Sequence, residues 1–191
     1  MRVMTRGLEV DFPKALAAAK RGDEEAWRHL FQIIAGRVVG FLVVRGVRDP
    51  ENVAGEVFAD VVRSLKRFQG DRRDFVSWTL TIAHRRMVDA VRSSVRRPED
   101  PTPADQLDRR DPVDVEDAAL GLVGADRARH LLARLTPEQA DVLALRIYGE
   151  MTLPEVARRL DKPLTAVTSL QHRALEALRR HLEGDRAPNS G

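Results

Sequence analysis

Hydrophobic positions recur at helical spacing along most of the chain, and no stretch shows the alternation that predicts a β-strand. Gly22 is a predicted helix end. Asp23 is a predicted cap, because its carboxylate can accept the free amide hydrogens of the next turn. The apolar positions after this cap are Ala26, Leu30, Ile33 and Ile34. The pattern therefore predicts two helices that divide at Gly22.

A further helix is predicted to begin at Asp49 and Pro50 and to have one apolar and one polar side. Its apolar stripe consists of Val53, Val57, Val61 and Leu65. Its polar side carries Asn52, Glu56, Asp60, Arg63 and Arg67. We interpret this segment as an amphipathic helix that packs against the others.

After a break at residues 69–74, the stretch FVSWTLTIAHRRMVDAVRSSVRR (residues 75–97) changes character along its length. One apolar stripe consists of Val76, Leu80, Ala83, Met87 and Val91. A second stripe begins as Phe75, Trp78 and Ile82 and continues as Arg85, Asp89, Arg92 and Arg96. We expect the first turns to be scaffold and the arginine-rich end to be exposed. We interpret Trp78 as a core residue rather than a base-stacking one, and His84 as a half-exposed residue rather than a ligand.

Residues 98–117 interrupt the helical pattern with four prolines and with eight acidic residues against two basic ones. This composition is typical of a linker. The polar residues 184–191 are predicted to be a disordered tail.

Beyond the linker, a short helical segment, a turn of three or four residues and a longer helical segment have the spacing of a helix-turn-helix. Thr152 and Glu155 form a predicted capping box at the start of the first segment. The inward positions are Val156, Ala157, Leu160, Val167, Leu170, Ala174 and Leu178. Outward positions on the second helix that could reach bases or phosphates include Thr165, Thr168, Ser169, His172 and Arg173. The alternative is a helical hairpin in a bundle with a solvated polar face.

These segments predict an all-α protein of two small helical domains joined by an acidic, proline-rich linker. The predicted boundaries are residues 1–97 for an N-terminal helical bundle, 98–125 for the linker, 126–183 for the helix-turn-helix domain and 184–191 for the tail. A composition of 43% hydrophobic and only 5% aromatic residues agrees with helices built from Leu, Val and Ala.

The net charge is only +3, so the placement of charge is more informative than its total. Residues 85–97 hold five Arg against one Asp, and residues 63–73 hold five basic residues against one Asp. Two such segments that flank a short loop could attract a nucleic-acid strand. The alternative is a solvated basic face on an ordinary bundle.

No residue pattern points to an enzyme, a cofactor or a metal site. The chain has no cysteine, and we find no HExxH, phosphate-binding glycine loop or GxSxG motif. We also find no apolar run of the roughly 20 residues that a membrane span requires. The sequence therefore predicts a soluble cytoplasmic binding protein.

Taken in order, the segments resemble the sigma factors of bacterial RNA polymerase, and among them the small two-domain extracytoplasmic-function (ECF) type. The resembling stretches are RGDEEAWRHLF, DPENVAGEVFADVVRSL, FVSWTLTIAHRRMVDAVR and, in the second half, the run from LTPEQADVLALRIYG to LEALRRHL. The order of these motifs is more specific than any one of them.

The resemblance implies that the chain binds core RNA polymerase and directs promoter recognition and melting. Polymerase-binding residues would be Glu51, Asn52, Glu56 and Asp60. The minus 10 element, with one base captured near residues 69–74, would be held by Arg72, Arg73, Arg85, Arg86, Arg92 and Arg96. The minus 35 element would be read by Thr165, Thr168, Ser169, His172 and Arg173. An anti-sigma protein is a further partner that relatives have.

The chain departs from the family pattern at several of these places. Asn52 and Gly55 stand where Asp and Gln are usual, and Thr79 stands where Leu is usual. Thr165 and Thr168 also stand in positions that are commonly Gly and a basic residue. The alternative function is a free-standing helix-turn-helix regulator, which would need a dimer seam or a sensor pocket.

Overall fold

The computed structural model describes residues 11–96 and 128–184, with side chains described for 11–92 and 128–183. Every regular element in these ranges is helical, so the all-α prediction is confirmed. The elements are α1 (Phe12–Lys20), α2 (Glu24–Val44), α3 (Pro50–Ser64), the 3-10 turn η1 (Leu65–Arg67), α4 (Arg72–Arg96), α6 (Pro137–Tyr148), α7 (Leu153–Leu160) and α8 (Leu164–Gly184). Residues 128–132 are helical as well. The predicted linker and residues 185–191 lie outside the described residues.

Three predicted helix starts are confirmed by their caps. The Asp23 carboxylate accepts the amide hydrogen of Ala26 at 2.8 Å. Gly22, the residue before Asp23, has a φ of +96° and turns the chain there. Asp49 caps α3 in the same way. Thr152 and Glu155 form the reciprocal capping box at the start of α7. These short-range polar contacts fix where the helices begin.

Helix α4 begins three residues earlier than predicted. The Asp71 carboxylate accepts the amide hydrogen of Asp74 at 2.8 Å, and the Asp74 carboxylate accepts that of Asp71 at 3.0 Å. This reciprocal pair is a capping box built from two aspartates. Arg72 and Arg73 therefore lie in the first helical turn instead of in a loop.

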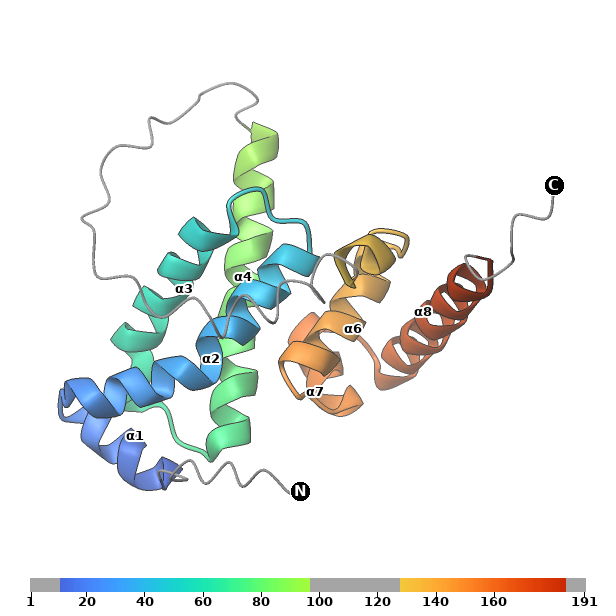
Figure 1. Ribbon diagram of the computed structural model, residues 1–191. Helices are drawn as coiled ribbons and strands as arrows, with labels where there is room; N and C mark the ends of the chain where they lie inside the picture. Colours follow the sequence, from blue (N-terminus) through green and yellow to red (C-terminus); the bar gives the residue numbers. More distant parts are fainter. Residues whose placement is uncertain (1–10, 97–127, 185–191) are drawn as a thin grey trace, which may run out of the picture.

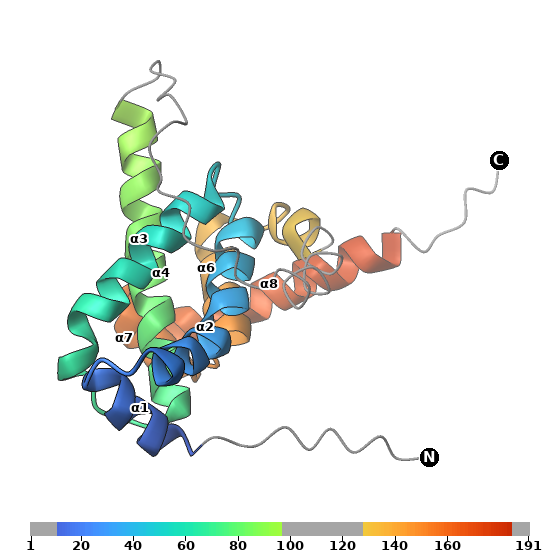
Figure 2. The same cartoon turned by 60° about the vertical axis from the view of Figure 1, so that its left-hand side comes forward.

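Helices α1 to α4 form a bundle at the N-terminal side (Figure 1). Each helix contributes the side chains of one apolar stripe to the core. The fully buried residues include Ile34, Phe41, Val57, Phe75 and Leu80. The predicted inward stripe of α4 is buried from Val76 to Met87. Its last member, Val91, is 53% exposed, as α4 extends past the bundle at its C-terminal end (Figure 2).

Four aromatic side chains close one end of the bundle. The ring of Phe68 lies 4.9 Å from that of Trp78 and 5.5 Å from that of Phe75, measured between centroids. Phe12 packs on Phe75 from α1 at 5.7 Å. Trp78 is therefore a partly buried packing residue, in agreement with the core interpretation.

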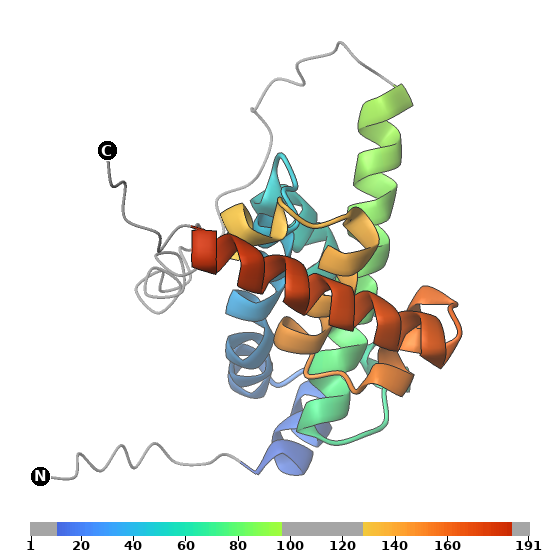
Figure 3. The ribbon, with the colours of Figure 1, turned by 90° about the vertical axis from the view of Figure 1, so that its right-hand side faces the viewer.

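Helices α6, α7 and α8 form the second part of the molecule (Figure 3). The predicted inward residues Val156, Val167 and Ala174 are buried between these helices. Asp161 ends α7 in the left-handed conformation, with a φ of +51°, and its amide hydrogen bonds to the carbonyl of Ala157. This turn sets the relative direction of α7 and α8, and the two helices form the predicted helix-turn-helix.

The two parts pack against each other and share one hydrophobic core across the described residues. Helix α6 lies against α2 and α4. Gly40 of α2 is a point of close approach, because a Cβ atom added there would lie 2.6 Å from the Tyr148 ring. The absence of a side chain at Gly40 thus lets α6 sit directly on α2.

Helix α2 corrects the expectation that no segment could span a membrane. By length and composition alone it is long and apolar enough. Leu30, Ile34, Val38 and Phe41 on this helix are fully buried within the protein. A core helix of a soluble protein passes the same test, and α2 packs against α1, α3, α4 and α6.

Candidate nucleic-acid interface

The arginines of α4 fall into exposed and paired groups. Arg72 and Arg92 are exposed, and no ion pair joins either one to another described residue. The Arg85 side chain is 60% exposed, with Nη2 3.4 Å from an Asp60 oxygen. The Arg86 side chain is 29% exposed and lies in a closer ion pair. The side chain of Arg96 lies outside the described residues. The predicted basic ridge is therefore partly neutralised by α3.

Asp60 is the carboxylate of α3 that neutralises part of this basic ridge. Its side chain, 12% exposed, accepts a hydrogen bond from Arg86 Nε at 2.6 Å and another from Arg63. The hydrogen bond from Arg86 is the main reason that the pKa of Asp60 falls to about 2, against the opposing effect of its desolvation. The same hydrogen bond raises the pKa of Arg86. The predicted polymerase contact of Asp60 would thus compete with these internal ion pairs.

The other predicted polymerase-binding residues are exposed on the outer side of α3. Glu51 and Asn52 are exposed in its first turn, and Glu56 is exposed one turn later. Glu56 makes one ion pair, with Arg86 Nη1 at 3.1 Å. Glu51, Asn52 and Glu56 form a polar surface at the N-terminal half of α3, where a partner can reach them.

The loop before α4 is shorter and more ordered than residues 69–74 suggested. Only residues 68–71 lie between η1 and α4. Phe68 is buried, and its carbonyl accepts a hydrogen bond from Lys20 Nζ at 2.5 Å. Gly70 has a φ of +149°, and an added Cβ would lie 2.6 Å from the Cβ of Asp74. Gln69 and Gly70 are the exposed tip of this loop.

Arg73 has a role that the sequence did not predict. Its Nη2 lies 2.6 Å from Glu155 Oε2 on α7, and its Nε and Nη2 donate to the carbonyl of Glu150 at 3.2 and 3.0 Å. Burial alone would raise the pKa of Glu155. Hydrogen bonds from Thr152 and Arg73 outweigh it and lower the pKa. Arg73 therefore joins the two parts of the molecule.

His84 also differs from its prediction, because it is 8% exposed rather than half-exposed. Its Nε2 lies 3.5 Å from Asp141 Oδ2 of α6, and its Nδ1 lies 3.4 Å from Arg159 Nη2 of α7. Burial lowers the pKa of Arg159. No local sequence signal could reveal this contact, since its partners are 57 and 75 residues further along the chain.

The predicted reading residues of α8 are all exposed. The set comprises Thr165, Thr168, Ser169, His172 and Arg173. Two of the hydroxyls donate to the helix backbone, Thr168 Oγ1 to the carbonyl of Leu164 and Ser169 Oγ to that of Thr165, both at 2.9 Å. This side of α8 points away from α6 and α7 and offers small polar groups with few charges.

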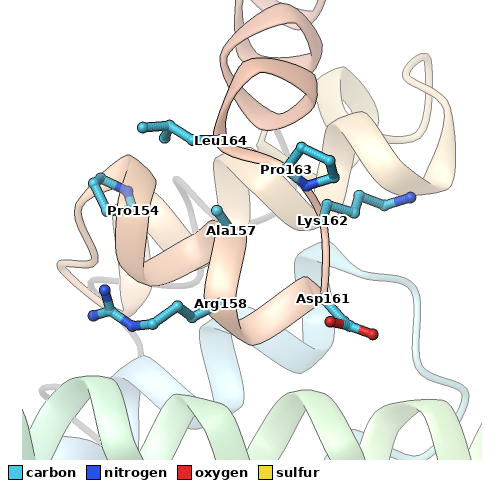
Figure 4. A pocket seen from close by; sticks show the side chains of 7 residues that line it. All are labelled: Pro154, Ala157, Arg158, Asp161, Lys162, Pro163 and Leu164. Carbon is cyan, nitrogen blue, oxygen red and sulfur yellow. The ribbon is translucent and has the colours of Figure 1, made fainter.

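A hollow of about 550 Å³ lies at the turn between α7 and α8 (Figure 4). Pro154, Ala157 and Leu164 form its apolar wall, and Arg158 and Lys162 stand at its sides. Lys162 Nζ is held by Glu138 at 2.7 Å. The hollow is thus a feature of the helix-turn-helix turn itself, beside the first residues of α8.

Comparison with known proteins agrees with this arrangement. Residues 24–97 match the family model for sigma-70 region 2, and residues 131–180 match that for sigma-70 region 4. The ECF RNA polymerase sigma factor SigK of Mycobacterium tuberculosis is 31% identical over 187 residues, which cover 92% of this chain and 96% of SigK. The chain belongs to the ECF sigma factors.

Two further similarities support this assignment. The ECF RNA polymerase sigma factor RpoE of Cereibacter sphaeroides is 31% identical over 168 residues, which cover 84% of this chain and 88% of RpoE. The structure of CnrH, solved in complex with the cytosolic domain of CnrY, has a TM-score of 0.61 at 22% identity. That match covers 90% of this chain and 97% of CnrH, and it shows a shared fold.

As a sigma factor, the protein binds core RNA polymerase and directs promoter recognition and melting for transcription initiation. The matches to regions 2 and 4, in that order, identify it as a sigma factor rather than a free-standing regulator. Sigma factors are initiation factors, and the chemistry of RNA synthesis belongs to the polymerase that they bind.

Proposed function

We propose that the sigma factor divides its task among three surfaces. The outer side of α3 binds core polymerase, the loop before α4 together with the exposed arginines of α4 holds the melted minus 10 strand, and the outer side of α8 reads the minus 35 duplex. The observation that carries this proposal is the exposure of these three surfaces on separate helices. The proposed domains are residues 1–97 and 126–183, with 98–125 as the linker.

For polymerase binding, we assign the direct contacts to Glu51, Asn52 and Glu56. Asp60, which the sequence placed with them, serves in this proposal as the anchor that orients Arg86 and Arg85. A carboxylate held by three guanidinium groups is poorly placed to bind a further partner, because the existing pairs would have to break first.

For the minus 10 strand, Arg72 and Arg92 are the arginines of α4 whose described side chains are exposed and form no ion pair with another described residue. Arg85 adds a largely exposed guanidinium between them. The affinity for a strand rises with the number of such groups that contact its phosphates. Gln69 and Gly70, at the tip of the loop, can receive a base that has left the stack. Arg73 joins this set once it is released from Glu155.

For the minus 35 duplex, the exposed hydroxyls of α8 can contact base edges or phosphates, and Arg173 can contact phosphate. With few cations on this surface, duplex affinity of the chain alone is expected to be low. Recognition then depends on polymerase to bring both elements together.

Reconstitution with core polymerase tests the proposal as a whole. The purified chain should co-elute with core RNA polymerase and support transcription from a promoter that core alone ignores. Tight, sequence-specific binding to duplex DNA without polymerase would contradict the division of labour proposed here.

A single charge reversal tests the α4 surface. Arg92→Glu should reduce promoter opening by at least tenfold while leaving polymerase binding within about twofold, because it removes one phosphate contact and repels the strand. Arg28→Glu on α2, also exposed, is the matched control and should behave like the parent. Equal loss of opening and of polymerase binding in Arg92→Glu would remove α4 from the minus 10 surface.

We propose in addition that the protein acts in the cytoplasm, where polymerase and promoter DNA are found. It needs no cofactor or metal in this scheme, and it has no catalytic step of its own. An anti-sigma protein is a proposed regulatory partner, and pull-down from cells that carry a tagged chain would identify one.

A further inference from the structure

Another hollow, of about 440 Å³, lies between α4 and α7. Trp78 and Thr81 of α4 and Arg158 and Arg159 of α7 are among the residues that line it. None of the residues assigned above to polymerase or to DNA is part of its lining. Small-molecule sites in proteins have volumes of roughly 300–1,000 Å³, so this α4–α7 hollow has the size of a ligand site.

The guanidinium group of Arg159 in this hollow has no counterion among the described residues. The side chain is partly buried, and no ion pair joins it to another described residue. Its Nε is buried without a hydrogen-bond partner in the described part of the chain, and its Nη2 lies 3.4 Å from His84 Nδ1. Burial lowers the pKa of Arg159, and the positive charge of Arg85 acts in the same direction. A bound anion would supply the missing compensation for this charge.

Arg158 brings a second positive charge to the same wall. It is exposed, and it too forms no ion pair with another described residue. Guanidinium groups bind phosphate oxygens through short, charge-assisted hydrogen bonds, often two at a time. The α7 wall of the hollow therefore suits a phosphate group.

Two carboxylates line the hollow as well, and both have donors of their own. Glu155 Oε2 accepts from Arg73 Nη2 and from the Thr152 amide, each at 2.6 Å. Asp74 Oδ2 accepts from the Asp71 amide at 3.0 Å. Neither carboxylate forms an ion pair with the two arginines of the α7 wall, so the positive charge there stays available to a ligand.

The α4 wall offers hydrogen-bond acceptors and an aromatic ring. Ser77 Oγ donates to the carbonyl of Asp74 at 3.1 Å, and Thr81 Oγ1 donates to that of Ser77 at 2.9 Å. With their hydrogens used in this way, both hydroxyl oxygens are left as acceptors. Trp78 adds apolar surface between them. This wall therefore suits a group that carries hydroxyls of its own, such as a sugar.

We propose that the α4–α7 hollow binds a small phosphorylated metabolite, with its phosphate on Arg158 and Arg159 and its hydroxyl-bearing part against Ser77, Trp78 and Thr81. A sugar phosphate is the simplest compound that carries both features. This function goes beyond promoter recognition, since it gives the sigma factor a site for a small molecule.

Binding is tested by the fluorescence of Trp78. The chain has two tryptophans, so Trp27→Phe leaves Trp78, which lines the hollow, as the single reporter. We expect a saturable change in its fluorescence with ribose 5-phosphate, a weaker response to inorganic phosphate and none to ribose. No saturable change with either phosphate compound up to about 10 mM would overturn the site. Equal affinity for the two would overturn the assignment of the α4 wall to a hydroxyl-bearing group.

Charge-removing variants of the same reporter chain test the two arginines. Arg159→Gln should weaken the binding of ribose 5-phosphate by roughly tenfold or more, because it removes a charge-assisted contact. Arg158→Gln should weaken it several-fold. The matched control is Arg180→Gln, at an exposed position near the end of α8, which should leave the affinity unchanged.

Helical circular dichroism should be the same in all three variants, because a partly buried charge without a counterion does not stabilise a fold. If Arg159→Gln nevertheless fails to fold, the exposed Arg158 still tests the site. Equal affinity in Arg158→Gln, Arg159→Gln and Arg180→Gln would overturn the proposal.

The source of the phosphate is tested with a fluorescein-labelled single-stranded oligonucleotide, since a DNA backbone carries the same group. For a metabolite site, Arg159→Gln should leave oligonucleotide affinity within about twofold of the parent, whereas Arg92→Glu should lower it. A loss in Arg159→Gln as large as that in Arg92→Glu would assign the hollow to DNA and overturn the metabolite proposal. An unchanged affinity in Arg92→Glu would instead count against the proposed minus 10 surface and leave the hollow's own test unaffected.

Discussion

At the scale of single residues, one unfavourable feature of the described core is the hydroxyl of Thr79. This side chain is fully buried on α4, and its Oγ1 has no hydrogen-bond partner within the described part of the chain. A buried polar atom without a partner costs free energy, while an apolar group of the same shape does not.

We predict that Thr79→Val increases the free energy of unfolding by about 1 kcal/mol, because it replaces the hydroxyl with a methyl group of similar size. Urea denaturation followed by circular dichroism measures the change. Thr81→Val is the control, since Thr81 Oγ1 already donates to the carbonyl of Ser77 at 2.9 Å and its replacement should be neutral or unfavourable. A destabilised Thr79→Val would mean that the hydroxyl has a partner.

Asp60 makes stability depend on pH. Its pKa is about 2 in the folded chain against an ordinary 3.8. The unfolded chain therefore binds more protons between these values, and the stabilisation by Asp60 is present above about pH 4 and lost as the pH falls toward 2. Asp60→Asn should lower the free energy of unfolding by about 2 kcal/mol at pH 7. Its difference from the parent should shrink when urea unfolding is repeated near pH 3.

The control for this prediction is Asp89→Asn, at an exposed position on α4. Its difference from the parent should be small at both values of pH. If Asp60→Asn were as stable as the parent at pH 7, the ion pairs with Arg86 and Arg63 would contribute nothing measurable.

At the scale of the helices, the sequence was most informative where the signal was local. The caps at Asp23, Asp49 and Thr152 were predicted because each lies within three residues of the amide hydrogen that it accepts. The aspartate pair at the start of α4 was missed, because Asp74 takes the position at which a capping box usually has Glu or Gln. His84 and Arg73 were misjudged for another reason, since their partners lie on helices far along the chain.

Substitution of two glycines, Gly70 and Gly55, compares an added Cβ at a strained turn with one at an open helical position. Gly70→Ala should lower the free energy of unfolding by at least about 1 kcal/mol, because its φ of +149° suits only glycine and the added Cβ meets Asp74. Gly55→Ala on the exposed face of α3 should raise it by up to about 1 kcal/mol, because nothing lies near the added Cβ. Thermal and urea unfolding measure both. Similar effects of the two changes would contradict the tight turn before α4.

At the scale of the whole molecule, the sequence predicted two helical parts but not their contact. The periodicity of each helix fixes which side is buried, whereas the contact between the parts depends on surface charges that are scattered over four helices and the turns beside them. Arg37, Arg45 and Asp141 look like ordinary solvated residues when read along the chain. Only folding brings them together, and the same is true of the fit between Gly40 and Tyr148.

A shared core has a thermodynamic consequence for the free protein. Because α6 packs on α2 and α4, the two parts should unfold in one cooperative transition, with calorimetric and van't Hoff enthalpies in a ratio near 1. Gly40→Gln places a side chain against the Tyr148 ring of α6 and should weaken the contact between the parts, so its heat-capacity trace should broaden or split into two transitions with a ratio above 1. Gly36→Gln should retain the single transition, because its side chain points into open space. Two transitions in the parent protein would show that the contact between the parts is too weak to couple their unfolding, and a single sharp transition in Gly40→Gln would show that this glycine is not where the coupling arises.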